Sequence, residues 1–234
     1  MNWVEYFFFQ IYPYLCLVVF AIGCWARFDR SQFSWRAESS EFLEKRTLTW
    51  ASNLFHIGVL GLLMGHAAGL LAPSQITEFL GLSAHAHQLL AVGAGSVFAA
   101  CAAAGGGGLL YRRLFNTRVR ATGRPTDLFI LLFVYMQLWL GIFGLPHSLM
   151  HSDGTIMETL GAWCRGVITF QPDLPALLVN IPLIYKLHLI TGMTLFLLTP
   201  FTRLVHVISA PIWYIFRPGW QIVRRNRHVA NEET

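Results

Sequence analysis

Four histidines lie inside long apolar segments, and their spacing could hold two metal ions at two depths. His56 and His66 are ten residues apart, and His188 and His206 are eighteen apart. On an ideal α-helix these intervals rise about 15 Å and about 27 Å, and both leave the two side chains on one face or nearly so. An ionisable side chain within a membrane needs a partner. Two such helices could therefore bind two haems, each between one histidine from either side.

The histidines occupy two of five apolar segments that are long enough to cross a bilayer. The chain of 234 residues is 55% hydrophobic and only 12% charged, and a span needs about 20 apolar residues. Helices satisfy their own backbone groups in lipid, whereas open strands do not. We therefore predict one all-α integral membrane domain over residues 1–234, with a short surface helix at 157–167 and transmembrane helices at about 3–26, 50–71, 87–110, 127–147 and 182–209.

The basic residues predict the orientation of this bundle. All but Arg165 and Lys186 of the 17 Lys and Arg residues follow the first, third or fifth segment, and such loops stay in the cytoplasm. The N-terminus should then be outside and the C-terminus inside the cytoplasmic (inner) membrane. The second and fifth segments run in opposite directions, so His56 pairs with His206 at the inner level and His66 with His188 at the outer level. The net charge of +5 reflects topology and does not indicate nucleic acid binding.

Small residues have two expected roles. Glycines near the histidines could make room for flat haem rings, and the run from Gly105 to Gly108 favours close helix packing. The glycines near the histidines are Gly58, Gly61, Gly65, Gly69 and Gly192.

Other metal chemistry has weaker support. The four cysteines show no CxxC or CxxCH spacing, so a c-type haem, zinc site or iron–sulfur cluster is not expected. A zinc or copper site needs three or four ligands at one depth, and His147 with His151 lacks a third ligand. A haem-free transporter using the intramembrane histidines and a purely structural anchor remain open at this level.

The polar and apolar motifs together closely resemble the gamma subunit of membrane-bound respiratory nitrate reductase, the cytochrome b chain of that complex. The resemblance covers nearly the whole chain in order, including the polar loops. It rests on FFFQIYPY (7–14), RFDRSQFSWRAESS (27–40), ASNLFHIGVLGLLMGHAAGLLAP (51–73), YRRLFNTRVRAT (111–122), HSDG (151–154) and LHLITGMTLFLLTPFTRLVH (187–206).

The resemblance implies a function and a set of ligands. His56 and His206 would bind the inner haem b iron, and His66 and His188 the outer one. The chain would oxidise quinol near the outer face and pass electrons to a cytoplasmic iron–sulfur beta subunit, which feeds a molybdenum-containing alpha subunit that reduces nitrate. The alternative is a gamma-like cytochrome b of another quinone-linked reductase, acting on a sulfur compound or a heterodisulfide.

The quinol site departs from the family at one position. Where relatives place a lysine before the third segment, this sequence reads AHAHQ, with His87 at the equivalent position and His85 nearby. We predict that quinol docks against Gly65, His66, Gly69 and His87, and that His87 takes or binds the hydroxyl proton. The competing interpretation of both histidines is a polar start of the helix at the membrane interface.

The cytoplasmic side offers further candidate contacts. Arg36, Arg112 and Arg203 could pair with anionic haem propionates, although each could equally be an orientation signal. The basic loops and the C-terminal tail, with Arg224 and Arg225, could dock the soluble subunits or contact anionic lipid headgroups.

Overall fold

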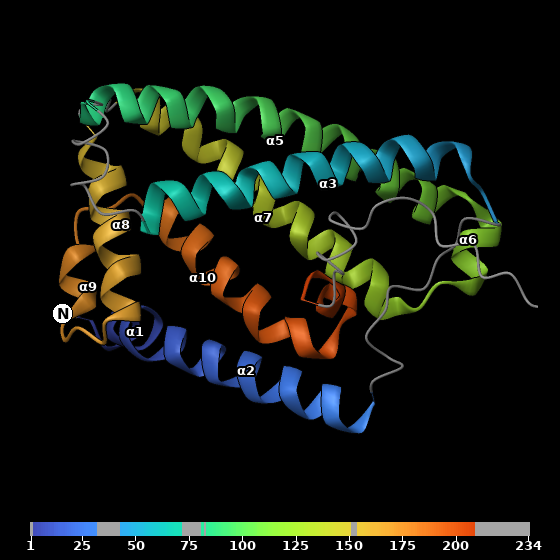
Figure 1. The fold of residues 1–234 in the computed structure, drawn as a ribbon, viewed down its shortest axis with the longest axis horizontal. Helices are drawn as coiled ribbons and strands as arrows, with labels where there is room; N and C mark the ends of the chain where they lie inside the picture. The colour runs from blue at the N-terminus through green and yellow to red at the C-terminus, as the bar shows by residue number, and fades with distance from the viewer. Residues whose placement is uncertain (1, 32–42, 72–80, 82, 151–153, 209–234) are drawn as a thin grey trace, which may run out of the picture.

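The computed structural model describes residues 2–31, 43–71, 81, 83–150 and 154–208, and within them the regular elements are helical (Figure 1). The all-α fold predicted from the sequence is confirmed. In chain order the elements are α1 (Trp3–Tyr6), η1 (Phe7–Ile11), α2 (Tyr12–Arg30), α3 (Arg46–His66), η3 (Ala67–Leu71), α5 (Ala84–Phe115), α6 (Thr117–Thr122), α7 (Pro125–Met150), α8 (Thr155–Ile168), α9 (Leu174–Leu177), α10 (Leu183–Leu198), η4 (Thr199–Phe201) and η5 (Arg203–Val207).

Five helical stretches are long and apolar enough to cross a membrane, as the sequence predicts. They contain few buried residues, since most of their apolar side chains face outward, which suits a lipid environment and not water. Their bounds are Trp3–Arg30, Arg46–Leu71, His85–Phe115, Pro125–Met150 and Leu183–Phe201.

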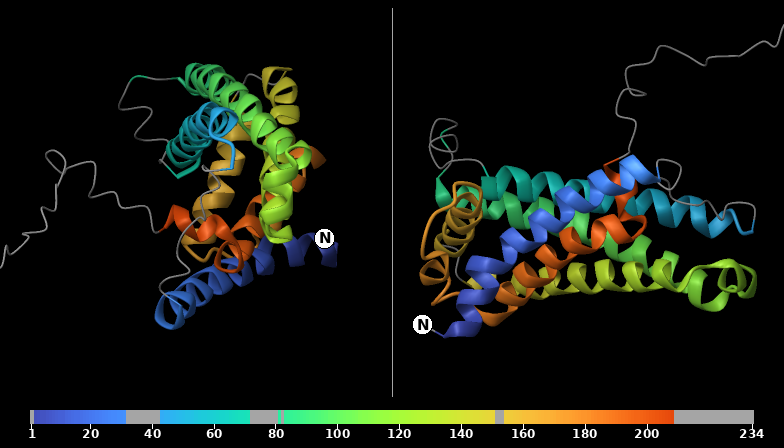
Figure 2. Two further views of the ribbon diagram at one scale, coloured as in Figure 1. Left: turned by 90° about the vertical axis from the view of Figure 1, so that its right-hand side faces the viewer. Right: turned by 90° about the horizontal axis from the view of Figure 1, so that it is seen from below.

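The spans follow one another around an arc. α3 packs on α5, α5 on α7, α7 on α10, and α10 on α2. Figure 2 shows this arc nearly end-on in its left panel. In Figure 1, α3 and α10 run in opposite directions with α7 behind them. The two histidine-bearing helices therefore face each other, while each is close-packed against other helices.

Glycines set the distance between α3 and α5. A Cβ atom on Gly105 would lie 2.6 Å from the carbonyl oxygen of Ala51, and one on Gly58 would lie 2.6 Å from the carbonyl oxygen of Phe98. Small residues let helix backbones approach this closely. The packing role predicted for Gly105 is confirmed. The haem-facing role predicted for Gly58 and Gly61 is wrong, because both glycines face α5, where a Cβ on Gly61 would meet the Phe98 ring.

The predicted surface helix at 157–167 is α8, which lies with α9 across one end of the bundle (Figure 1). Its buried face centres on Trp163, which is 1% exposed and donates its indole N–H to the carbonyl oxygen of Phe9 at 3.1 Å. α8 also packs against η3, the segment that follows His66. The helix therefore covers the end of the bundle at which His66 and His188 lie.

Two predicted helix ends differ from the structure. α7 continues through Pro146 to Met150. In that turn the Tyr185 hydroxyl donates to the Gly144 carbonyl oxygen at 2.8 Å, and donors from neighbouring helices make prolines tolerable in membrane spans. α10 ends at Leu198 and not near residue 209, because Pro200 lacks an N–H group and its ring clashes with the preceding turn. His206 consequently lies on the short turn η5.

Because α3 and α5 approach closely, the effect of a Gly→Ala replacement on stability should depend strongly on its position along α5. Gly105→Ala should lower the free energy of unfolding by about 1–3 kcal/mol, because the added Cβ would force the two backbones apart. Thermal unfolding of the detergent-purified chain would measure the change. Gly95→Ala is the matched control on the same helix, since a Cβ there would meet nothing within 4 Å; equal stability of the two variants would contradict this packing.

Candidate functional site

The structure brings together the histidines that the depth argument pairs. The ring centroids of His56 and His206 lie 6.2 Å apart, with 71° between the ring planes. Those of His66 and His188 lie 6.0 Å apart, with 31° between the planes. Each pair joins one residue of α3 to one residue of the α10–η5 segment, so the two pairs form two levels of one site.

These separations fit an iron between two imidazoles. Two rings bound from opposite sides, with metal–nitrogen bonds of about 2 Å, have centroids roughly 6 Å apart. The rings are therefore spaced as two axial ligands of a haem would be. A direct hydrogen bond between two imidazoles would bring their ring centroids closer together than this.

Three of the four histidines have their Nδ1 atoms bonded to main-chain carbonyl oxygens. The acceptors are Ser52 for His56 at 2.7 Å, Leu62 for His66 at 2.7 Å and Arg203 for His206 at 2.5 Å. A carbonyl can only accept, so each Nδ1 carries the proton and each Nε2 keeps its lone pair. This is the tautomer of a metal-bound histidine, and the Nδ1 bond also fixes the ring orientation.

His188 is held differently, by the amide of Gln137 on α7. Gln137 Nε2 donates to the carbonyl oxygen of His188 at 3.0 Å and lies 3.4 Å from its Nε2 atom. Thr191 donates its hydroxyl to Gln137 Oε1. One turn along α7, a Cβ on Gly141 would lie 3.1 Å from the His188 ring. α7 thus supplies both the space for this imidazole and the amide that holds its backbone, while His188 Nδ1 is buried without a hydrogen bond to any residue that the structure describes.

The surface of α3 and η3 beside the pair of His66 and His188 is open. A Cβ on Gly65 would meet nothing within 4 Å, and one on Gly69 would meet only the methyl group of Met157, at 3.8 Å. His66 itself is exposed. Gly192 faces Gln137 instead, since a Cβ there would lie 3.1 Å from the amide nitrogen. Of the glycines that the sequence associates with haem, Gly65 and Gly69 are the two with free space beside them.

His87 and Gln88 lie near the start of α5. The His87 side chain is half-buried, and in the described part of the chain it makes no hydrogen bond or ring contact with His66. The adjacent Gln88 is 2% exposed and donates to the carbonyl and hydroxyl oxygens of Ser148 at 2.6 and 3.0 Å. The start of α5 is therefore bonded to the end of α7, which holds His87 at that end of the bundle.

Sequence reasoning missed two amides that organise this site. Gln88 and Gln137 both lie inside apolar segments, where an amide needs partners from another helix. That signal could have flagged them, but it would not have shown which residues they bond.

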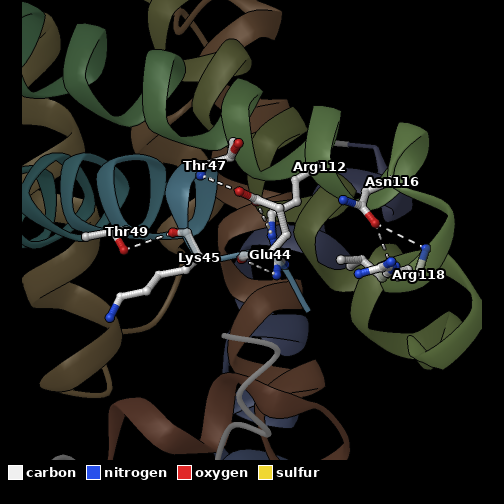
Figure 3. A network of polar contacts seen from close by, with 8 residues as sticks. Glu44, Lys45, Thr47, Thr49, Arg112, Asn116 and Arg118 are labelled. Carbon is white, nitrogen blue, oxygen red and sulfur yellow. Dashed lines mark hydrogen bonds and ion pairs between the residues drawn. The ribbon is translucent and has the colours of Figure 1, made fainter. Parts of the chain in front are cut away.

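The arginines proposed for the inner level have different surroundings. Arg112 is almost fully buried, and its guanidinium bonds Glu44 through Nε to Oε2 at 3.0 Å and through Nη2 to the carbonyl oxygen at 2.9 Å (Figure 3). Glu44 Oε1 in turn accepts from the main-chain N–H of Thr47 at 2.8 Å. Arg112 thus joins the end of α5 to the start of α3. Arg36 lies outside the described residues.

Arg203 is the arginine closest in the chain to an inner histidine. Its carbonyl oxygen accepts the His206 Nδ1 bond, and its Nη1 lies 3.8 Å from Asp127 Oδ2 on α7. Arg113 of α5 lies 3.6 Å from the same oxygen. This cluster of two arginines and one carboxylate joins η5, α5 and α7 beside the inner histidine pair.

Comparison with known proteins gives a consistent set of relatives. The chain matches the family described as nitrate reductase gamma subunit over residues 5–226. It is 43% identical to the respiratory nitrate reductase 2 gamma chain of Escherichia coli (strain K12), covering 97% of this chain and 100% of the relative. It is 43% identical to the respiratory nitrate reductase 1 gamma chain of the same organism, covering 96% and 99%. It is 39% identical to the nitrate reductase gamma chain of Bacillus subtilis (strain 168), covering 88% and 92%.

The contact between Glu44 and Arg112 predicts a pH-dependent contribution to stability. The Thr47 N–H and the Arg112 guanidinium lower the pKa of the Glu44 carboxyl. A lowered folded-state pKa stabilises the fold above the unfolded value of about 4.3, and this stabilisation is lost as the pH falls through the folded pKa. Thermal unfolding at pH 7 should therefore show Glu44→Gln to be less stable than the parent, with a smaller difference in acid.

The control for this prediction is Glu158→Gln on α8, whose side chain is exposed. It should match the parent at both pH values. A stability difference between Glu44→Gln and the parent that did not shrink in acid would show that the carboxylate charge is unimportant at this contact.

Proposed function

Because the chain belongs to the nitrate reductase gamma subunit family, we propose that it holds two haems b between paired histidines and conducts electrons inward from quinol. It is the membrane cytochrome b subunit of a respiratory nitrate reductase. The observation that carries the proposal is the pair of imidazole separations, 6.2 and 6.0 Å, at two levels between α3 and the α10–η5 segment.

The residues fit this cofactor in number, and three of the four histidines also fit it in tautomer. His56 and His206 would hold the inner iron, and His66 and His188 the outer one. A haem b with two histidine ligands exchanges one electron at a time and has no open axial position for oxygen chemistry. Main-chain bonds at three Nδ1 atoms and the Gln137 amide beside the fourth histidine would keep the rings aimed at one another.

Quinol would bind at the outer level. The free space beside Gly65 and Gly69 adjoins η3 and α8, and His87 lies at the same end of the bundle. Histidine is the side chain that most often takes a proton from a reacting group, so His87 Nδ1 or Nε2 is the proposed acceptor for a quinol hydroxyl proton. Gly65 and Gly69 would allow the flat quinol ring to approach the backbone of α3.

The arrangement of the two levels also has an energetic consequence. Protons released outside while electrons move inward separate charge across the membrane. Moving one charge against 100 mV costs about 2.3 kcal/mol. The potential difference between quinol and its acceptor must supply this work, which gives a reason for two ligand pairs at different depths.

The acceptor side would face the cytoplasm, where an iron–sulfur beta subunit and a molybdenum-containing alpha subunit are the proposed partners. The helix α6 begins after the Asn116 cap (Figure 3). Its Arg118 and Arg120 side chains are exposed. Such a basic face suits docking of a soluble subunit or contact with anionic lipid headgroups. Arg203, beside the inner pair, is the better placed propionate partner, because it is more exposed and lies 3.8 Å from its carboxylate, whereas Arg112 is almost fully buried and lies 3.0 Å from Glu44.

Single histidine replacements test the ligand assignment. His66→Ala should abolish the outer haem signal and His206→Ala the inner one, each leaving the other haem, because each removes one axial ligand from one level. Reduced-minus-oxidised spectra with redox titration of purified complexes would measure this. Loss of the same component in both variants would contradict the proposed pairs.

A second replacement tests the quinol site. His87→Ala should lower quinol-dependent haem reduction on the order of 10²-fold or more, as expected for loss of a proton acceptor, while both haems stay in the spectrum. Rapid mixing with a reduced quinol analogue would follow the reaction. His147→Ala, an exposed histidine on α7, is the control, and unchanged reduction in His87→Ala would reject the role of His87.

A further inference from the structure

The fifth span is broken just before the inner histidine, and the break leaves carbonyl groups in need of donors. α10 ends at Leu198, and the chain turns through η4 and η5. The last carbonyl groups of a helix have no partner within the helix, and Pro200 cannot continue the backbone ladder. Something outside this segment must satisfy the groups around Pro200 and Thr202.

Arg27 of α2 supplies both donors. Its Nη1 atom donates to the carbonyl oxygen of Pro200 at 2.8 Å and to that of Thr202 at 2.8 Å. The Arg27 side chain is half-buried, so these charge-assisted bonds lie partly out of water, where they are strong. One turn earlier, a Cβ on Gly23 would lie 2.7 Å from the Pro200 ring. α2 therefore meets the break with a glycine that allows contact and an arginine that bonds it.

Hydrogen bonds between residues close together in the chain connect the break to His206. Thr202 is 7% exposed; its hydroxyl donates to the Leu198 carbonyl oxygen at 2.9 Å and accepts from the Leu204 N–H at 3.4 Å. The next residue, Arg203, offers the carbonyl oxygen that accepts the His206 Nδ1 bond. The carbonyl group of Pro200 is thus only three positions before that of Arg203, and no long helix fixes the position of His206.

The position of His188, the proposed outer ligand in the same segment, does not depend on the Arg27 contact. His188 lies within α10, where the helix and Gln137 of α7 hold it. The end of α10 lies beside the last turns of α2 in Figure 1, and α2 packs against η4. A change at Arg27 should therefore reach the inner level and leave the outer level as it is.

We propose that Arg27 is a positioning residue for His206: by bonding the two carbonyl groups at the break, it fixes the turn that aims this imidazole at His56. The inference rests on the proposed function, in which His206 is the inner haem ligand. It assigns Arg27 a role beyond the orientation signal that its place after the first span supplies.

The test uses the assembled membrane complex with three replacements. Arg27→Gln removes the charge and the double donor. Arg27→Lys keeps the charge, and so the orientation, on a shorter side chain without the planar guanidinium. Arg30→Gln is the matched control, because it removes a cation from the last turn of the same helix at an exposed position. Redox titration and haem content would be measured for each level, with the levels assigned by His66→Ala and His206→Ala.

The proposal expects a selective effect on the inner haem. Arg27→Gln should weaken inner haem retention on the order of 10-fold, as for loss of other residues that orient a ligand, and should displace the inner midpoint potential. Arg27→Lys should displace that potential by a smaller amount. Arg30→Gln and the outer haem should match the parent throughout.

Two results would overturn the proposal. One is an inner haem in Arg27→Gln with the potential and retention of the parent, or an equal loss of both haems. The other is an Arg27→Lys complex whose inner haem has the potential and retention of the parent, because a positive charge alone would then be enough to position His206. This second result decides the matter if the Arg27→Gln chain fails to insert. A parent complex without haem would instead refute the proposed function.

Discussion

An imidazole inside a bilayer needs partners for its nitrogen atoms, and the structure depends on the different surroundings of four such rings. His56, His66 and His206 direct Nδ1 to main-chain carbonyl groups, while the Gln137 amide donates to the carbonyl oxygen of His188. In the proposed site these bonds would orient the rings, and the other nitrogen of each would bind the metal. The ring-centroid separations of 6.0 and 6.2 Å fit an iron between the two imidazoles of each pair.

The helices are arranged to keep these rings apart by that amount. Gly58 and Gly105 draw α3 onto α5, and α7 stands between this pair and α10. α7 also carries Gly141 and Gln137, which make room for His188 and hold its backbone. At the inner end, Arg27 and Asp127 connect α2 and α7 to the turn that carries His206. Contacts from α2 and α7 therefore hold the segment that carries His188 and His206.

Much of this architecture follows from the sequence because hydropathy and loop charge act over whole segments. The five spans and the pairing of His56 with His206 and of His66 with His188 needed only segment length and orientation.

The break at Pro200 was missed because an apolar run through Phe196 and Phe201 resembles a continuous helix, and the donors that stabilise the break come from Arg27, far away in the chain. Gly58 and Gly61 were misassigned because periodicity places them near the ligand face without showing which neighbour they meet. The roles of Gln88 and Gln137 depend on contacts between spans, which no local pattern encodes.

Near-infrared magnetic circular dichroism of the oxidised complex, scaled to the concentration of this chain, would test the paired histidines most directly, because it reports the axial ligands of a ferric haem. The expected result is two low-spin haems b per chain, each with two imidazole ligands. One haem per chain, or a haem with a different or missing axial ligand, would contradict the two-level site.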